Sequence, residues 1–204
     1  MLGFQNCKAT VETVVWLTDA TMCWPMQSSL DGEGGLLIAD CCNSVIRRVL
    51  ANGIVATVAG VGQPGSTGDS GPATMARLNF PQSVASAGMS VGFWIVSSLQ
   101  CLVWKSCLTL ALLFSPQADT TNFAVRFVDQ RGIIRTIAGV LGSSPSYNGD
   151  GWHATAARLS SVVGIALDLP GTGVYIVSQH ARVGYLFVVF PHRSFPLSAT
   201  RGTM

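Results

Sequence analysis

The chain contains two copies of one sequence pattern, and this repetition limits the folds open to it. Residues 45–61 read VIRRVLANGIVATVAGV, and residues 124–140 read AVRFVDQRGIIRTIAGV. A second pair follows, GDSGPATMARL at residues 68–78 and GDGWHATAARL at residues 149–159. Fifteen of the 28 aligned positions are identical, and the copies lie 79 residues apart in the first pair and 81 apart in the second. Such regular repetition is typical of repeat proteins, in which each unit buries its apolar face against the next.

The composition predicts a globular chain with many turns. Of the 204 residues, 49% are hydrophobic, 11% are charged and 22 are glycine. This chain is too apolar for a disordered protein, and its glycines suit tight turns between short strands. The net charge of +2 indicates neither a nucleic-acid partner nor an anionic membrane. The N-terminal residues lack a basic segment followed by an uninterrupted apolar run, so we predict no signal peptide and assign no compartment.

Short runs rich in β-branched residues predict antiparallel strands joined by tight turns. An Asn-Gly pair at residues 52–53 separates two of these runs and is a strong hairpin signal. Four short antiparallel strands per unit suit a blade of a β-propeller, which buries its faces against neighbouring blades. The runs of the first copy are 29–31, which with the glycines after it resembles a fourth strand and its turn, 36–40, 45–50 and 54–59. Those of the second copy and beyond are 125–129, 133–138, 163–168, 174–178 and 185–190.

These residues resemble the NHL repeat. The stretches LLIADCCNSVIRRV, GIVATVAGVGQPGSTGDSGPATMARLNFP and GIIRTIAG follow its pattern, and the match covers residues 25–85 and 119–180. The resemblance implies an all-β fold, an incomplete β-propeller built from four-stranded antiparallel NHL blades. The predicted units are 1–24, an eroded tail of a preceding blade or a disordered segment; 25–87, the first blade and the following loop; 88–160, the second blade; 161–190, a partial third blade; and 191–204, a tail.

The predicted number of blades is too small for a closed ring. Fewer than three blades are recognisable, and a ring generally needs at least four. Open sheet edges favour pairing with another chain. We therefore expect either that copies of the chain assemble, or that the chain is part of a longer product.

An apolar insert interrupts the second predicted blade. Val125 follows Ile95 by thirty residues, whereas Ile46 follows Ile38 by eight. Removal of residues near 99–118 restores the pattern and joins GFWIVS to DTTNFAVRFVD. The insert is therefore an addition to a blade and does not begin a new one.

The same region raises the possibility of a membrane span. Residues 91–114 are apolar, with Lys105 as their single charge, and about 20 apolar residues can cross a bilayer. A charge near the centre of a membrane helix is costly, and a span would separate consecutive strands of one blade. We therefore favour an inserted apolar loop, or translated non-coding sequence, over a membrane-tethered sensor.

Two patterns invite a ligand-binding interpretation. Residues 60–65 match G-x-G-x-x-G and follow a strand, but the next residues, STGDSGP, cannot form the helix that a dinucleotide site requires. We interpret them as a loop between blades. Asp69 and Asp150 occur at the same place in the two copies, where a carboxylate is expected to accept backbone N–H bonds and cap a short turn.

Catalytic chemistry receives little support from the sequence. Asp40 ends a strand, Asp119 is its candidate counterpart, and a propeller hydrolase or lyase with a channel metal would use such carboxylates as ligands. The three histidines, His153, His180 and His192, do not recur in register, and no hydrolase or metalloprotease motif is present. We therefore predict no catalytic, cofactor-binding or metal-ligating residues and no cofactor. The enzyme remains the alternative hypothesis.

The expected function is a non-catalytic interaction module that binds protein partners through its loops. Some NHL propellers bind RNA on a basic face, but the small net charge favours arginines that solvate strand edges. A membrane partner is expected only if residues 91–114 form a span. The arginines considered are Arg47, Arg48, Arg77, Arg126, Arg131, Arg135, Arg158 and Arg182.

Overall fold

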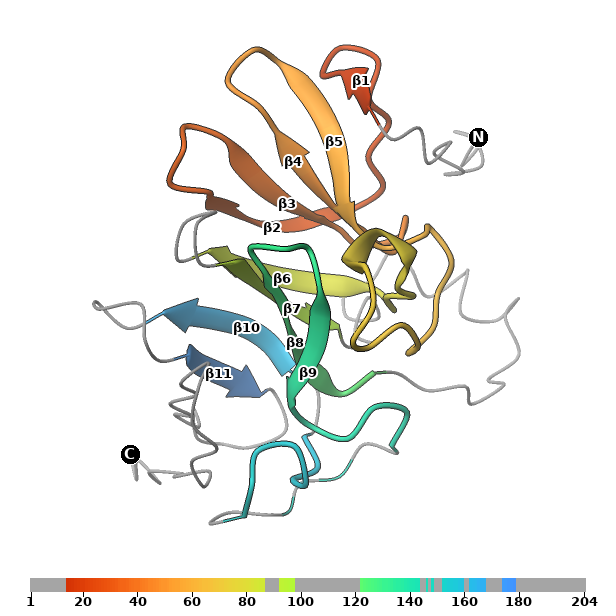
Figure 1. Cartoon of the computed structure of the whole chain (residues 1–204), viewed down its shortest axis with the longest axis vertical. Helices are drawn as coiled ribbons and strands as arrows, with labels where there is room; N and C mark the ends of the chain where they lie inside the picture. Colours follow the sequence, from red (N-terminus) through yellow and green to blue (C-terminus); the bar gives the residue numbers. More distant parts are fainter. Residues whose placement is uncertain are drawn as a thin grey trace, which may run out of the picture.

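The protein is all-β and is built from three antiparallel sheets. The computed structural model describes residues 14–86, 92–97, 122–143, 146, 148, 152–159, 162–167 and 174–178. Within these residues the one helical element is a short 3₁₀ turn, η1 (Ala73–Met75). The sheets are stacked in chain order, as blades are in an incomplete propeller (Figure 1). The predicted all-β class, with antiparallel sheets arranged as in an incomplete propeller, is therefore confirmed.

The first sheet has five strands in the order β1-β5-β4-β3-β2. Four of them form an up-and-down meander in sequence order, as the hairpin signals predict. β1 was not predicted, and it pairs with the outer side of β5, so residues 14–16 extend this sheet. The strands are β1 (Val14–Trp16), β2 (Pro25–Leu30), β3 (Leu36–Asp40), β4 (Val45–Val49) and β5 (Ile54–Ala59).

The second sheet has four strands in the order β6-β7-β8-β9. β7 pairs with β8 in register from Ser97↔Ala124 to Gly92↔Asp129, so the predicted joining of these two segments across the insert is confirmed. β6 was not predicted, and its pairing with β7 moves it from the first predicted unit, 25–87, into the second. The strands are β6 (Pro81–Ser86), β7 (Gly92–Ser97), β8 (Ala124–Asp129) and β9 (Ile134–Ala138).

The third sheet contains β10 (Val162–Leu167) and β11 (Val174–Ser178), which form an antiparallel pair. The predicted strand at residues 185–190 and the insert at 99–118 lie outside the described residues. In the part of the chain that the structure describes, no helix is long and apolar enough to cross a membrane. Residues 92–97 of the apolar window belong to β7, an interior strand of the second sheet.

The sequence repeat is reproduced as repeated backbone geometry. The register shifts between Ile46 and Arg47 in the β4–β5 pair, and between Val125 and Arg126 in the β8–β9 pair. Because 79 residues separate the members of each pair, the same bulge occurs in both blades. The N–H of Gly60 and that of its equivalent, Gly139, each donate to an alanine carbonyl of the following loop at 2.9 Å.

The sheets pack face to face through two equivalent apolar cores. Each core combines one sheet, the alanine- and leucine-containing loop that leaves it, and the next sheet, which explains why the ATxARL pattern recurs. The core between the first and second sheets contains Leu37, Ala39, Ile46, Ala59, Ala73, Ala76, Leu78, Val84, Ile95, Val128 and Ile134. The core between the second and third contains Ala85, Phe123, Val125, Ala138, Ala154, Ala157, Leu159, Val162, Ile165, Val174 and Ile176.

Strands β2, β6 and β10, one from each sheet, lie next to one another, and Ser83 links them. Its buried hydroxyl donates to the side-chain oxygen of Gln27 on β2 and accepts from the backbone N–H of Ile165 on β10 at 3.1 Å. Ser29 on β2 also accepts a hydrogen bond from the N–H of Ser86 on β6 at 3.2 Å. This polar seam explains why β6, with the sequence PQSVAS, lacks the apolar alternation of a half-buried strand.

Candidate functional site

The loop between the first two sheets is attached to the second sheet by Asp69. Its Oδ1 accepts hydrogen bonds from Nε (2.9 Å) and Nη2 (2.5 Å) of Arg126 on β8, and its Oδ2 accepts one from the N–H of Thr136 on β9 (3.0 Å). The guanidinium also donates to the carbonyl oxygens of Arg77 (3.0 Å) and Thr67 (3.3 Å). Arg126 is 1% exposed, so its charge is neutralised inside the protein by the preceding loop.

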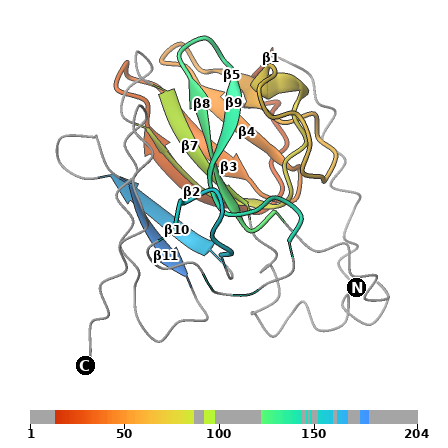
Figure 2. The same ribbon diagram turned by 60° about the horizontal axis from the view of Figure 1, so that its bottom comes forward.

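Backbone bonds extend this attachment along the loop. Ser70 N–H donates to the carbonyl of Ile134 at 2.8 Å, and Ala73 N–H donates to that of Gly132 at 2.7 Å. Ile134 N–H in turn donates to the carbonyl of Gly71 at 3.0 Å. The loop lies beside β9 (Figure 2) and pairs with it almost as an additional strand.

Asp69 accepts a backbone N–H bond as predicted, from Thr136, but the prediction that it caps the turn at η1 is wrong. Pro72 occupies the N-cap of η1, and no side chain caps this turn. The carboxylate turns to the next sheet because a buried guanidinium there requires a counter-charge. Asp150, the equivalent residue, lies outside the described residues.

Asp40 has a structural role at the end of β3. Its side chain is fully buried, and Oδ1 accepts from the N–H of Cys23 (2.8 Å). Oδ2 accepts from Nδ2 of Asn43 (2.8 Å) and from Nε of Arg47 (3.4 Å). Both oxygens are thus used in joining the chain before β2, the β3–β4 turn and β4.

The strand register does not support Asp119 as the counterpart of Asp40. Asp40 pairs with Val45, and the equivalent Ala124 pairs with Ser97, so a serine occupies the matching position. Asp119 itself lies outside the described residues. Among the described residues, no group of three or more His, Cys, Asp or Glu side chains could hold a metal ion.

Two of the predicted surface arginines are buried, which corrects the view that they solvate strand edges. Arg47 and Arg126 occupy equivalent positions and are 4% and 1% exposed. Arg47 forms an ion pair with Asp40 of its own sheet and donates a hydrogen bond to the hydroxyl of Thr57 at 2.5 Å. Arg126 takes its carboxylate from the preceding loop, because the position equivalent to Asp40 holds serine. Neither guanidinium is available to bind phosphate.

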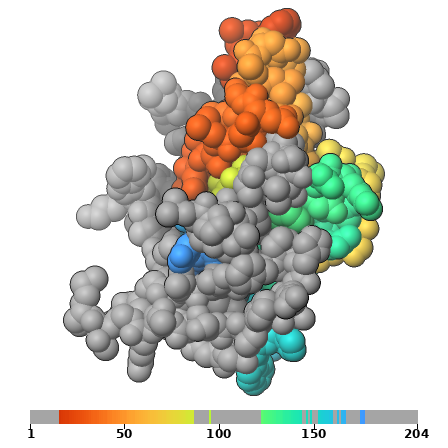
Figure 3. Space-filling view, turned by 60° about the vertical axis from the view of Figure 1, so that its left-hand side comes forward, coloured from red at the N-terminus to blue at the C-terminus, as the bar shows by residue number. Residues whose placement is uncertain are grey.

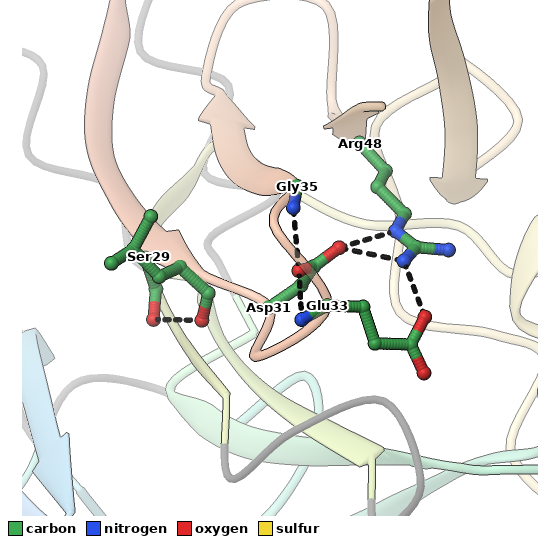
Figure 4. A network of polar contacts seen from close by, with 6 residues as sticks. Ser29, Asp31, Glu33, Gly35 and Arg48 are labelled. Carbon is green, nitrogen blue, oxygen red and sulfur yellow. Dashed lines mark hydrogen bonds and ion pairs between the residues drawn. The ribbon is translucent and has the colours of Figure 1, made fainter. Parts of the chain in front are cut away.

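A second ionic network lies at the other end of the first sheet, where β2 turns into β3 and β4 ends (Figure 4). Asp31 is fully buried, and its Oδ1 accepts from the N–H groups of Glu33 and Gly35, both at 2.8 Å. Its Oδ2 accepts a hydrogen bond from Nε of Arg48 at 2.7 Å and forms an ion pair with Nη2 at 2.7 Å, and Arg48 also pairs with Glu33 at 2.8 Å. The network fixes the β2–β3 turn to β4.

The contacts within this network shift the pKa values of Asp31 and Arg48. Burial by itself raises the pKa of Asp31, but the bonds from the Glu33 N–H, the Arg48 guanidinium and the Gly35 N–H outweigh burial and lower that pKa below its ordinary value. Burial lowers the pKa of Arg48, and its bonds to Asp31 and Glu33 outweigh this and raise it. Both groups are therefore held in their charged forms, as suits a structural ion pair.

The exposed apolar side chains of the inter-sheet loops are the strongest candidates for binding. Met75 is 70% exposed and Trp152 is 58% exposed, and each belongs to the loop that follows the last strand of a sheet. Exposed Arg77 and Arg158 occupy equivalent positions in the same loops. The two loops meet near their beginnings, where a Cβ on Gly142 would lie 3.9 Å from the hydroxyl oxygen of Ser66. Sequence reasoning aligned these arginines but had no signal for the exposure of Met75 and Trp152.

The remaining predicted positions show no ligand-binding geometry. The G-x-G-x-x-G residues 60–65 form an irregular loop with no helix after them, as predicted. Gly60 approaches the backbone of the β3–β4 turn so closely that a Cβ would lie 2.9 Å from Val45 Cα. His153 is exposed in the second loop, whereas His180, His192 and Arg182 lie outside the described residues.

Comparisons with known proteins leave the family unassigned. No protein-family model matches the chain, and no curated protein matches it. Among solved structures, a structural genomics protein of unknown function from Bacteroides thetaiotaomicron is similar at 28% identity and a TM-score of 0.34, over 38% of this chain and 19% of that one. Hydrazine synthase from Kuenenia stuttgartiensis is similar at 13% identity and a TM-score of 0.44, over 88% of this chain. The chain spans 35% of that enzyme, and neither likeness supports an inference about function.

Proposed function

We propose that the chain is an NHL-type propeller segment that acts as a non-catalytic protein-binding module. The repeat pattern supports the NHL assignment, since its recurring residues have recurring tasks. Arg47 and Arg126 are both buried, and each forms an ion pair with an aspartate. Gly60 and Gly139 both permit close backbone approach. These residues stabilise the sheets and their connections, whereas the exposed side chains of the loops remain accessible to a partner.

The observation that carries the proposal is the exposure of Met75 and Trp152 on two adjoining loops. Methionine, tryptophan and arginine are enriched at protein interfaces, and tryptophan and arginine frequently dominate the binding energy. Here the two apolar side chains are accompanied by Arg77 and Arg158. Backbone bonds to neighbouring sheets pre-organise the first loop, which reduces the entropy lost on binding.

Affinity capture with matched variants tests this proposal. The wild-type chain, the double variant Met75→Asp/Trp152→Asp and the control Leu17→Asp are immobilised and exposed to lysate. Leu17 is also an exposed apolar residue, but it follows β1, outside the two loops. We expect a protein that the wild type and the control retain and the double variant loses. Equal capture by all three chains, or no capture above background, would refute a loop-mediated interaction.

A further inference from the structure

The first sheet has one face that no other described sheet covers. Residues that pair across its strands, Ser28, Ile38, Arg47 and Thr57, share this face, which we call the incoming face. In the second sheet the equivalent set is Val84, Ile95, Arg126 and Thr136. In the third sheet the first two positions are Ile165 and Ile176.

The incoming face is buried wherever a preceding sheet lies on it. Val84 and Ile95 are fully buried beneath the first sheet, and Ile165 and Ile176 are buried against the second. In the first sheet the same two positions, Ser28 and Ile38, are exposed and half-buried. The contrast follows from position in the stack, because the first sheet is its end (Figure 3).

Apolar side chains surround the open part of this face. Met26 and Leu30 alternate with Gln27 and Ser29 along β2, and the latter two bond to the second sheet. Met26 and Leu30 therefore point away from it, and Leu30 is 73% exposed. Arg47 and Val55 are already buried, so the open area lies over β2, β3 and the half-buried Val49.

The other end of the stack presents the complementary type of face. Leu37, paired with Ser29, packs from the first sheet onto the second. The corresponding pair in the third sheet is Tyr175 with Ala166, in which Tyr175 is half-buried and Ala166 is exposed. The described pair of the third sheet thus corresponds to residues that cover an incoming face inside the chain, and another molecule of the same chain supplies it.

We propose that two copies of this chain associate head to tail, each placing its third sheet on the incoming face of the other. The contact continues an interface that the chain already forms twice within itself, which is why a second copy is the occupant whose shape and chemistry fit. A twofold arrangement pairs both open faces of both copies and closes the assembly. Two sets of three sheets make about six blades, within the range of about four to eight found in propellers.

Mass measurement by light scattering coupled to gel filtration, over a wide range of protein concentration, tests this association. The wild-type chain should approach twice the 21.4 kDa of one chain. Leu30→Lys should raise the dimer dissociation constant by about tenfold or more, because a buried, unpaired ammonium is strongly unfavourable. Met75→Lys, an exposed loop residue outside the incoming face, should leave the constant unchanged.

The unfolding midpoint of Leu30→Lys shows whether the monomer is intact, and Ser28→Lys replaces it if folding fails. A wild-type mass of one chain at every concentration overturns the proposal. A dimer whose dissociation constant is changed by neither Leu30→Lys nor Ser28→Lys also overturns it, as does a mass greater than that of two chains. These outcomes are independent of loop-mediated partner binding, which involves Met75 and Trp152.

Discussion

Replacing Asp69 by alanine should remove the ionic attachment between the first two sheets. Among the described residues, the variant leaves Arg126, which is 1% exposed, with the carbonyl oxygens of Arg77 and Thr67 as its remaining partners. Breaking a buried ion pair by removing one partner costs about 3–5 kcal/mol. Asp69 is 34% exposed on its side chain, so water can reach part of the vacated site and reduce the loss. We therefore expect a loss of about 3 kcal/mol in the free energy of unfolding.

Graded variants separate charge from hydrogen bonding. Asp69→Asn keeps an acceptor without the charge and should cost about 1–2 kcal/mol. In an Arg126→Met background, Asp69→Ala should cost less than about 1 kcal/mol, since no buried charge remains to be neutralised. Asp19→Ala is the control, because the carboxylate of Asp19 is exposed and bonds only to the neighbouring Thr18 among the bonds found for it.

Urea unfolding gives these free energies, and hydrogen exchange locates the effect. Loss of the attachment should reduce the protection of the Ser70 and Ala73 amides, which bond to Ile134 and Gly132 across the interface. If Asp69→Ala matches Asp19→Ala in stability and retains wild-type protection at these amides, the assigned role of Asp69 is wrong.

Two further predictions concern the Asp31 network. Gly35→Ala should cost about 2–3 kcal/mol, because its Cβ would overlap the Asp31 carboxylate and lie 2.9 Å from the Val49 carbonyl oxygen. Gly34→Ala, at φ +83° with open space around it, should cost about 1 kcal/mol, and equal unfolding free energies for the two variants would contradict the steric argument. Because the folded-state pKa of Asp31 lies below its unfolded value of about 4, its ionised form stabilises the protein above that pH, and this contribution disappears as the pH falls through the folded-state pKa. Urea titrations should therefore show Asp31→Asn to be less stable than wild type at pH 7, with a difference that narrows towards pH 3, and a constant difference would refute the coupling.

Local sequence was sufficient to predict most strands and turns. The strands at 36–40, 54–59 and 174–178 occur with the predicted boundaries, and β4, β8, β9 and β10 differ by one residue, whereas β2 begins four residues before the predicted run 29–31. This success has a simple cause, since alternation and turn glycines act over a few residues. Of the two strands that were missed, β1 and β6, the second is the more informative. Its Ser83 and Gln82 are buried polar residues, and the partners of Ser83 lie 56 and 82 residues away.

The repeat thus established by itself that the chain is built from equivalent β units that pack in series, because its pattern of apolar residues, glycines and turns is written twice. Only the tertiary structure decided which charged residues of these units form ion pairs with one another. Arg47 and Arg126 are aligned in sequence, yet one pairs within its sheet and the other with a loop 57 residues away. The same holds for exposure, since Leu37 is buried and Leu30 is not. Burial and ion pairing depend on which face meets which neighbour, and that is a property of the stack of sheets.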